Sequence, residues 1–477
     1  MRVCFRLTAL ASLVLAGSLW SRPVSDPVAD LFTPRPPLPP GAENQAAVPL
    51  RPPENPNPAG FKVFPSPPQT IPPRRPPFRF QANDRVLFLG DAILEAEAKY
   101  GYIETRMAIQ DPTTPLTFRN LSASPNNRLR DADPAAANRD FAWLTNLLAE
   151  VRALDPNVVV LSYGTAAALN GPPNLPAFTN VYERVIDGLL ALKPATPPRL
   201  VLLSPLCHEP VTGEPMELIA HRVAQMFEFA VASWILSTNH NTDFVDLFGL
   251  TRLKVNAALK TEANGESKPR LTEDGLRPTA YGQRSLTFAL DRGLRWFPNN
   301  WRFGLLANNQ WREGGFGLKF ESHRRSDHDL RAVFTEERLP SPPLPVPIAD
   351  PEQEYEPHCY IQLRDLVPGR YELRMDGQHV LTGTHEDWAR YEVIASGPSW
   401  DQAEKLRQTI VEKNARWTAW WQQQREHGPG PLGEPTPEIL ALEKVISTLK
   451  RPVKHAYEVV RVGDVAPTTN QPPPTPH

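Results

Sequence analysis

Short apolar runs alternate with helical stretches along residues 84–295, and this alternation constrains the fold more than any other feature of the sequence. The runs are apolar on both faces, which is typical of strands buried in a parallel sheet. We expect strands at Arg85–Gly90, Thr117–Leu121, Asn157–Ser162, Arg199–Ser204 and Asp243–Leu247, and helices at Asp140–Leu154, Phe178–Leu192, Glu217–Leu236 and Thr279–Arg295. The alternation predicts an α/β domain over residues 81–296, with helices on both faces of a parallel sheet.

Four short segments at the expected carboxyl ends of these strands carry motif-like sequences, and ligands of parallel sheets bind at that edge. They read Gly90-Asp91-Ala92, Asn120-Leu121-Ser122-Ala123-Ser124-Pro125-Asn126, Tyr163-Gly164-Thr165-Ala166 and Asp274-Gly275-Leu276-Arg277. In order and spacing they resemble the blocks of the SGNH (GDSL) ester hydrolase superfamily, in particular its exported bacterial branch. The resemblance implies a three-layer α/β/α, flavodoxin-like domain and ester hydrolysis.

The resemblance also assigns a catalytic triad, and two of its three positions are substituted here. The family's nucleophilic hydroxyl follows Gly-Asp, where this chain has Ala92, so no acyl intermediate can form at that position. The family's histidine base corresponds to Arg277, which stays protonated and cannot accept a proton. Only the acid, Asp274, is kept, and we expect it to form an ion pair with Arg277 across the former site.

The oxyanion-binding groups of the family are substituted as well. Pro125 stands where a glycine amide would donate, and proline has no N–H. Ala166 replaces an asparagine whose side chain would donate. Loss of one such donor typically costs about 10²–10³ in rate. The strand-end glycines Gly90 and Gly164 remain, so the sequence predicts that the scaffold is kept without the chemistry.

Catalysis by relocated groups is the alternative. Ser122 and Ser124 belong to the same strand ends, but loop hydrogen bonding is the more usual role of such serines. Asp91 and Asp274 could act as paired carboxylates on a sugar, although backbone bonding at the strand-to-helix turn is the favoured role of Asp91. His208 and Glu209 match a His-Glu pair that the family branch often carries, which makes them candidates for the pocket wall.

Proline is concentrated near the N-terminus, where residues 22–78 hold 19 of the 55 in the chain. Proline removes backbone donors and fixes φ, so we expect residues 22–80 to be a disordered, polyproline-rich spacer. Residues 1–21 carry two arginines and then a short apolar run, which indicates a signal peptide or, alternatively, an uncleaved N-terminal anchor. We therefore expect an exported protein in the periplasm, cell envelope or extracellular space of a bacterium, with membrane contact only through an uncleaved N-terminal segment.

Charge and cysteine content exclude several classes of protein. With 51 basic and 53 acidic residues and a pI near 6.6, the chain shows no basic stripe for nucleic acid. The three cysteines are too few for a disulfide scaffold or a multi-cysteine zinc site, and we expect Cys207 and Cys359 to be buried free thiols. We expect no metal and no cofactor.

Beyond residue 296 the pattern changes to short strands and turns. Residues 297–397 predict a small β-rich module, with Asp376-Gly377 as a hairpin turn. Its tryptophans would either bind carbohydrate or, as is more usual, pack the module against the rest of the chain. Residues 398–460 predict a helical region with a tryptophan stripe that docks on the protein, and residues 461–477 a disordered tail.

Together these features favour a catalytically inactive SGNH protein that binds a ligand or acts as a scaffold at the cell envelope. A carbohydrate or an acyl-bearing small molecule is the expected ligand, and the oligomeric state stays open. The alternatives are an esterase on acylated carbohydrate or lipid that uses relocated residues, and a purely structural surface protein.

Overall fold

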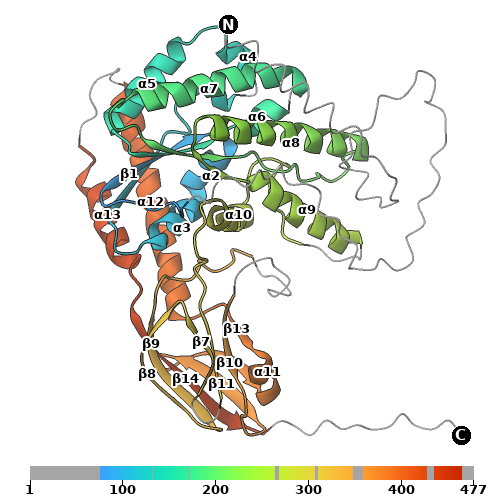
Figure 1. Cartoon of the computed structure of the whole chain (residues 1–477), viewed down its shortest axis with the longest axis vertical. Coiled ribbons are helices and arrows are strands. Elements are labelled where there is room, and N and C mark those ends of the chain that lie inside the picture. The colour runs from blue at the N-terminus through green and yellow to red at the C-terminus, as the bar shows by residue number, and fades with distance from the viewer. Residues whose placement is uncertain are drawn as a thin grey trace, which may run out of the picture.

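A parallel sheet forms the centre of the α/β domain in the computed structural model (Figure 1). The structure describes residues 76–131, 133–169, 171–263, 268–306, 310–346, 358–426 and 434–464. The strands are β1 (Asp84–Gly90), β2 (Leu116–Asn120), β3 (Val158–Ser162), β4 (Arg199–Leu203) and β5 (Asp243–Val245). Their order, β2-β1-β3-β4-β5, is that of flavodoxin-like sheets. The predicted α/β class and parallel sheet are confirmed.

Helices cover both faces of this sheet, because alternate residues of each strand point to opposite sides. The helices are α2 (Ala92–Tyr100), α3 (Tyr102–Gln110), α4 (Pro134–Ala137), α5 (Ala142–Leu154), α6 (Thr165–Ala168), α7 (Leu175–Ala191), α8 (Met216–Asn239), α9 (Leu247–Ala263) and α10 (Ala280–Gly293), with 3₁₀ turns at Arg128–Arg130 and Pro172–Asn174. One core holds Leu87, Val159 and Leu202 together with α5, α7 and α8. The other core holds Val86, Val158 and Val201 together with α2, α3 and α10.

The first described residues, which the sequence analysis assigns to the spacer, are part of the folded domain. Phe78 and Phe80 are buried and pack against Trp296. The backbone N–H of Phe78 donates to Leu294 O, and the Trp296 indole donates to Phe78 O at 2.6 Å. The fold thus begins a few residues earlier than the apolar run of β1 indicates.

The β-rich module contains two facing sheets. The strands are β6 (Arg302–Leu305), β7 (Trp311–Phe316), β8 (Leu318–Arg325), β9 (Asp329–Glu336), β10 (Cys359–Leu363), β11 (Arg370–Met375), β12 (Gln378–Thr384), β13 (Glu392–Ile394) and β14 (Lys454–Gly463), with the short helix α11 (His385–Arg390). One sheet has the order β13-β10-β6-β7 and the other β12-β11-β14-β9-β8. Their shared core holds Trp301, Trp388 and Trp400, so these tryptophans pack the module and offer no exposed sugar platform.

The C-terminal region joins both parts of the molecule. Helix α12 (Pro398–Glu426) runs from the β-rich module to the α/β domain, where α13 (Pro437–Leu449) packs beside it (Figure 1). Trp417 and Trp421 are buried in the core of the α/β domain, which confirms the predicted docking of the tryptophan stripe. Strand β14 then returns to the middle of a β-module sheet, between β11 and β9, and it includes residues 461–463, which the sequence analysis assigns to the tail.

Two further expectations concern cysteines and membranes. Cys207 and Cys359 are both free and buried, as predicted. Among the described residues, no helix combines the length and the apolar character that crossing a bilayer requires. The expected signal peptide or anchor at residues 1–21, most of the expected spacer and residues 465–477 lie outside the described residues.

Candidate functional site

Asp91 closes the carboxyl end of β1 and ties it to β3. Its backbone N–H donates to Ser162 O at 2.8 Å, and its Oδ2 accepts from the Thr165 N–H at 2.8 Å. Its Oδ1 is buried and has no hydrogen-bond partner among the described residues. Burial outweighs the hydrogen bond from Thr165 and raises the pKa of Asp91 to about 7. The Asp91 side chain does not cap α2, so its predicted bonding at this strand-to-helix turn is replaced by a bond to the backbone at the start of α6.

A buried hydrogen-bonded cluster supports Gly90 from the β2 side. Ser122 Oγ accepts from the Gly90 N–H at 3.1 Å, and Asn127 Nδ2 donates to Gly90 O at 2.8 Å. The Tyr163 hydroxyl donates to Asn127 Oδ1 at 2.7 Å. Sequence reasoning did not single out Asn127 or Tyr163, although Tyr163 opens a motif block and Asn127 follows another directly. Ser122 is thereby committed to backbone support at the strand end.

Ser124 and Pro125 lie farther along the same loop and are not directed at Gly90. The Ser124 hydroxyl is buried and donates to Glu150 Oε2 on α5 at 2.7 Å. Pro125 is exposed and supplies no N–H. The loop is therefore anchored to α5 by a serine and a carboxylate, which is the bonding role that the sequence favours for this serine.

The positions that correspond to the nucleophile and to the oxyanion asparagine carry only methyl groups. Ala92 is half-buried at the first position of α2, and Ala166 is half-buried in α6. Gly164 stands two positions before Ala166; its φ of 110° favours glycine, and a Cβ there would come within 3.2 Å of the Phe178 ring. The backbone of the block is thus kept in its unusual conformation while its side-chain chemistry is absent.

His208 and Glu209 follow β4 and hold the loop at residues 270–278. The Glu209 carboxylate accepts from the backbone N–H groups of Leu271 and Thr272 at 3.0 and 2.7 Å and from the Thr272 hydroxyl at 2.6 Å. The buried His208 ring packs against Gly275, where a Cβ would lie 2.5 Å from the ring. His208 Nε2 lies 2.7 Å from Glu214 Oε2. Both residues therefore act on the loop that carries Asp274 and Arg277.

Asp274 and Arg277 form an ion pair at this loop, as predicted. Arg277 lies with a guanidinium nitrogen 2.8 Å from Asp274 Oδ2, and its backbone N–H donates to Asp274 Oδ1 at 2.8 Å. Partial burial acts in the opposite direction, but these backbone hydrogen bonds and the guanidinium charge lower the pKa of Asp274. The side chains are 39% and 66% exposed, so the pair faces solvent and Asp274 is ionised at neutral pH.

Helices α2 and α10 connect the carboxyl end of β1 with the loop that carries Asp274 and Arg277. Gln283 Nε2 on α10 donates to Ile93 O, in the first turn of α2, at 2.6 Å. The Tyr100 hydroxyl at the end of α2 donates to Glu273 Oε1 in the loop at 3.1 Å. The structure thus fastens the Asp274–Arg277 loop to the helix that begins at Ala92.

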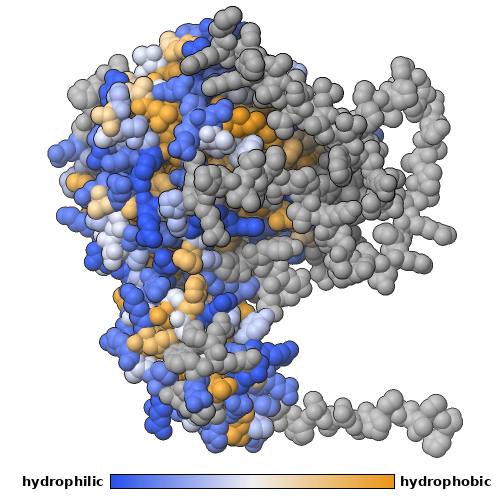
Figure 2. Space-filling view, viewed as in Figure 1, coloured by the Kyte–Doolittle hydropathy of each residue, from blue (hydrophilic) through white to orange (hydrophobic). Residues whose placement is uncertain are grey.

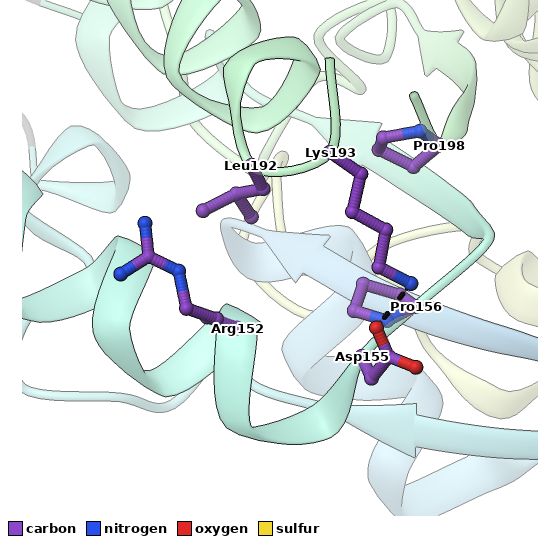
Figure 3. A pocket seen from close by; sticks show the side chains of 6 residues that line it. All are labelled: Arg152, Asp155, Pro156, Leu192, Lys193 and Pro198. Carbon is purple, nitrogen blue, oxygen red and sulfur yellow. Dashed lines mark ion pairs between the residues drawn. The ribbon is translucent and has the colours of Figure 1, made fainter. Parts of the chain in front are cut away.

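A shallow pocket lies at the opposite edge of the sheet, before the amino ends of β3 and β4 (Figure 3). It is lined by Arg152, Asp155, Pro156, Leu192, Lys193 and Pro198. Asp155 forms ion pairs there with Lys193 and with Arg85. Because ligands of parallel sheets bind at the carboxyl edge, this pocket does not belong to the candidate site. No group of three or more potential metal ligands is found in the described part of the chain.

A solved structure of an enzyme aligns with most of this chain. It is a gut microbial diltiazem-metabolizing enzyme, with a TM-score of 0.58 and 14% sequence identity, and the alignment covers 80% of this chain and 99% of that one. The chain has the SGNH hydrolase fold. The aligned 80% of this chain is longer than the α/β domain. The alignment with that enzyme therefore extends beyond this domain into the C-terminal part.

Two other solved structures cover less of the chain. A putative GDSL-like lipase from Parabacteroides merdae is 15% identical over 46% of this chain and 99% of its own, with a TM-score of 0.34. The acetyl xylan esterase AlAXEase is 18% identical over 43% and 97%, with a TM-score of 0.29. No family model and no curated protein matches the sequence. The SGNH fold hosts more than one function, so function has to be argued from the site itself.

The raised pKa of Asp91 predicts how stability depends on pH. The folded chain keeps the Asp91 proton up to about pH 7, whereas the unfolded chain releases it near 3.8. The folded state therefore binds more protons in this window, so its stability falls as pH rises from about 4 to 7 and levels off above that. We expect Asp91→Asn to flatten this part of a plot of Tm against pH. Glu217→Gln, at an exposed carboxylate on α8, is the control and should leave the slope unchanged. An equal effect of both variants would contradict the prediction.

Proposed function

We propose that this chain is a non-catalytic SGNH protein that binds a ligand at the former active-site edge and acts at the bacterial cell envelope after export. The observation that carries the proposal is the loss of both reactive groups together: Ala92 has no hydroxyl, and Arg277 is held by Asp274 as a permanent cation. An ester hydrolase of this type needs a nucleophile and a base within hydrogen-bond reach. The kept scaffold bonds around Gly90 and Gly164 support a retained binding role.

Apolar side chains at the rim of this edge support an acyl-bearing ligand. Leu169 follows α6, Val211 follows the His208-Glu209 segment, and Met216 and Leu218 begin α8; all four are exposed. Figure 2 shows hydrophobic side chains gathered over α6 and α8 on the visible face. Exposed apolar side chains that gather beside a strand-end site are typical of a ligand-contacting surface. A carbohydrate that carries an acyl group would place that group against this rim.

The relocated-hydrolase alternative has less support from the contacts. Ser122 and Ser124 bond to Gly90 and Glu150, and the His208 ring bonds to Glu214. Burial raises the pKa of the neighbouring Cys207 thiol to about 12, so it is not a thiolate nucleophile. A nucleophile–base pair would require one of these groups to leave its partner.

Activity and binding are tested together with 4-methylumbelliferyl octanoate. We expect the purified protein to bind this ester without hydrolysing it above the buffer rate, and to stay unlabelled by a fluorophosphonate probe, because no activated serine is present. Hydrolysis that disappears in Asp274→Ala would contradict the proposal and favour relocated catalysis. Binding should weaken at least five-fold in Met216→Asp and stay unchanged in Val445→Asp, an exposed apolar position on α13. Absence of binding would favour the purely structural alternative.

Restoring the two reactive groups tests whether the scaffold still matches the family geometry. We expect Ala92→Ser with Arg277→His to become labelled by the fluorophosphonate, because the double variant carries a hydroxyl at the nucleophile position and an imidazole at the position that pairs with Asp274. Neither single variant should be labelled, since each lacks one partner of the pair. Turnover should stay low in the double variant because Pro125 and Ala166 supply no oxyanion donors. Labelling of Ala92→Ser alone would show that another base serves position 92.

A further inference from the structure

A row of aromatic side chains, three of them exposed and one half-buried, crosses the outer face of the sheet β13-β10-β6-β7. Phe297, Phe316, Tyr360 and Tyr391 form it together with Arg302, and we call this row the aromatic strip. The ring centroids of Phe297 and Phe316 are 6.4 Å apart, and those of Tyr360 and Tyr391 are 5.3 Å apart. The Arg302 guanidinium joins the two pairs, at 5.7 Å from the Phe316 ring and 5.9 Å from the Tyr360 ring.

Strand register explains why these side chains share one face. Arg302 pairs with Phe316 on β7 and with Tyr360 on β10, and residues directly opposite in a sheet point to the same side. The alternate residues Phe303 and Ile361 are buried in the module core. The strip is open to solvent, since Phe297 is 64%, Phe316 37% and Tyr391 44% exposed. Its residues lie outside the motif blocks, and the strip does not depend on the proposed function.

The described structure begins at Pro76, which is bonded to Arg295, two positions before Phe297 in the sequence. Arg295 Nε donates to Pro76 O at 3.0 Å, and Pro76 is the first described residue. Phe297, the most exposed ring, follows Arg295 by two positions. Residues 65–73, Pro-Ser-Pro-Pro-Gln-Thr-Ile-Pro-Pro, end three positions before Pro76 in the sequence.

The chemistry of that segment matches the strip. Proline-rich chains dock on aromatic surfaces because proline rings stack well on aromatic rings. A chain that is already in the polyproline II conformation also loses little entropy on binding. Nine residues in that conformation would extend about 28 Å. The strip crosses from β7 to β13, which is about 14 Å at ordinary strand spacing. The segment is thus long enough to cover it from the Phe297 end.

We propose that residues 65–73 dock in cis on the aromatic strip and so fix the direction in which the N-terminal segment leaves the folded protein. Tethering gives the segment an effective concentration of about millimolar, so even a weak site is occupied. The docked segment would cover the exposed rings, and the N-terminal export segment would then extend from the β-rich module.

Photo-cross-linking in the full chain tests this docking. With p-benzoylphenylalanine in place of Tyr360, we expect an intramolecular cross-link to the tryptic peptide of residues 63–74, which contains the whole segment. The same probe at Val445, an exposed position on α13, is the control and should not label that peptide. Replacing the five prolines at 65, 67, 68, 72 and 73 by serine should reduce the yield at least five-fold, whereas serines in place of the five prolines at 34–40 should leave it unchanged.

Other outcomes would overturn the proposal. A cross-link between two chains would assign the strip to self-association. Affinity gels that contain a polysaccharide test for sugar binding. If the polysaccharide retards the protein, and this retardation is lost in Phe316→Ser but unaffected by the five serines, the strip binds a sugar. If no cross-link forms to residues 63–74, or if the five serines leave the yield of that cross-link unchanged, the prolines do not recognise the strip. Thermal melting of each variant, expected to match the wild type, confirms that the module stays folded.

Discussion

Lys413→Met is expected to lower the free energy of unfolding by about 3–5 kcal/mol, the usual cost of removing one partner from a buried ion pair. Lys413 Nζ lies 2.6 Å from Glu104 Oε1, and both side chains are only 2% exposed. Asn414 Nδ2 adds a hydrogen bond to the same carboxylate at 3.1 Å. Without Lys413, the Glu104 charge stays buried between α3 and α12 with an amide as its remaining side-chain partner.

A second buried carboxylate makes this position more sensitive. Glu97 accepts from the backbone N–H groups of Ile103 and Glu104, both at 2.9 Å, and so holds the turn between α2 and α3. Burial raises the pKa of Glu97 to about 8, and the charge of Lys413 acts against that shift. Loss of Lys413 therefore disfavours ionisation of Glu97 as well. Because α2 begins at Ala92, the docking of α12 also supports the helix at the candidate site.

Urea denaturation followed by tryptophan fluorescence measures the effect, since Trp417 and Trp421 lie on the same helix as Lys413. Lys405→Met on the exposed side of α12 is the matched control and should change stability by less than about 0.5 kcal/mol. Adding Glu104→Leu to Lys413→Met should recover most of the loss, because the double variant leaves no unpaired charge at that position. A loss below about 1 kcal/mol for Lys413→Met alone would show that Glu104 does not need this partner.

Such long-range pairs mark the limit of what the sequence predicts. The apolar runs predict the central strands because burial on both faces leaves a continuous signal, and the helix at residues 398–426 shows its stripe of Leu406, Ile410 and Trp417. Helices α3 and α9 have no clear apolar stripe and were not predicted. Strand β14 includes residues 454–460, which were predicted to belong to a helical region. It completes a sheet between β9 and β11, and strand partners far apart in sequence leave no local trace.

The residues of the candidate site were likewise predicted only in part. Motif blocks place Gly90, Asp91, Gly164 and Asp274 because the resemblance fixes their order, and the ion pair of Asp274 with Arg277 follows from opposite charges three residues apart. Asn127 was not predicted, because an asparagine in a polar loop has many uses and only the fold brings it to Gly90 O. The lesson is that the sequence indicates which chemistry is absent, whereas the contacts show what each kept side chain does.

Gly282→Ala is expected to destabilise the protein by about 3 kcal/mol, the upper end of the usual cost of inserting a methyl group into closely packed structure. A Cβ on Gly282 would lie 1.9 Å from Leu271 O and 2.9 Å from its carbonyl carbon. Both are backbone atoms, so no side-chain rotation relieves the clash. Leu271 O also accepts from the Thr279 N–H at 2.9 Å, which leaves the start of α10 little room to move.

The clash would displace the loop that carries the Asp274–Arg277 pair. The Leu271 N–H donates to Glu209 Oε1, so a shift of Leu271 pulls on the bonds that hold residues 270–278 against β4. Gly282→Ala should therefore weaken octanoate-ester binding as well as stability, whereas Gly463→Ala, where a Cβ would meet nothing within 4 Å, should change neither. Thermal melting and ligand titration of both variants measure this. If Gly282→Ala melts like the wild type, the close contact between α10 and Leu271 is not a constraint on the site.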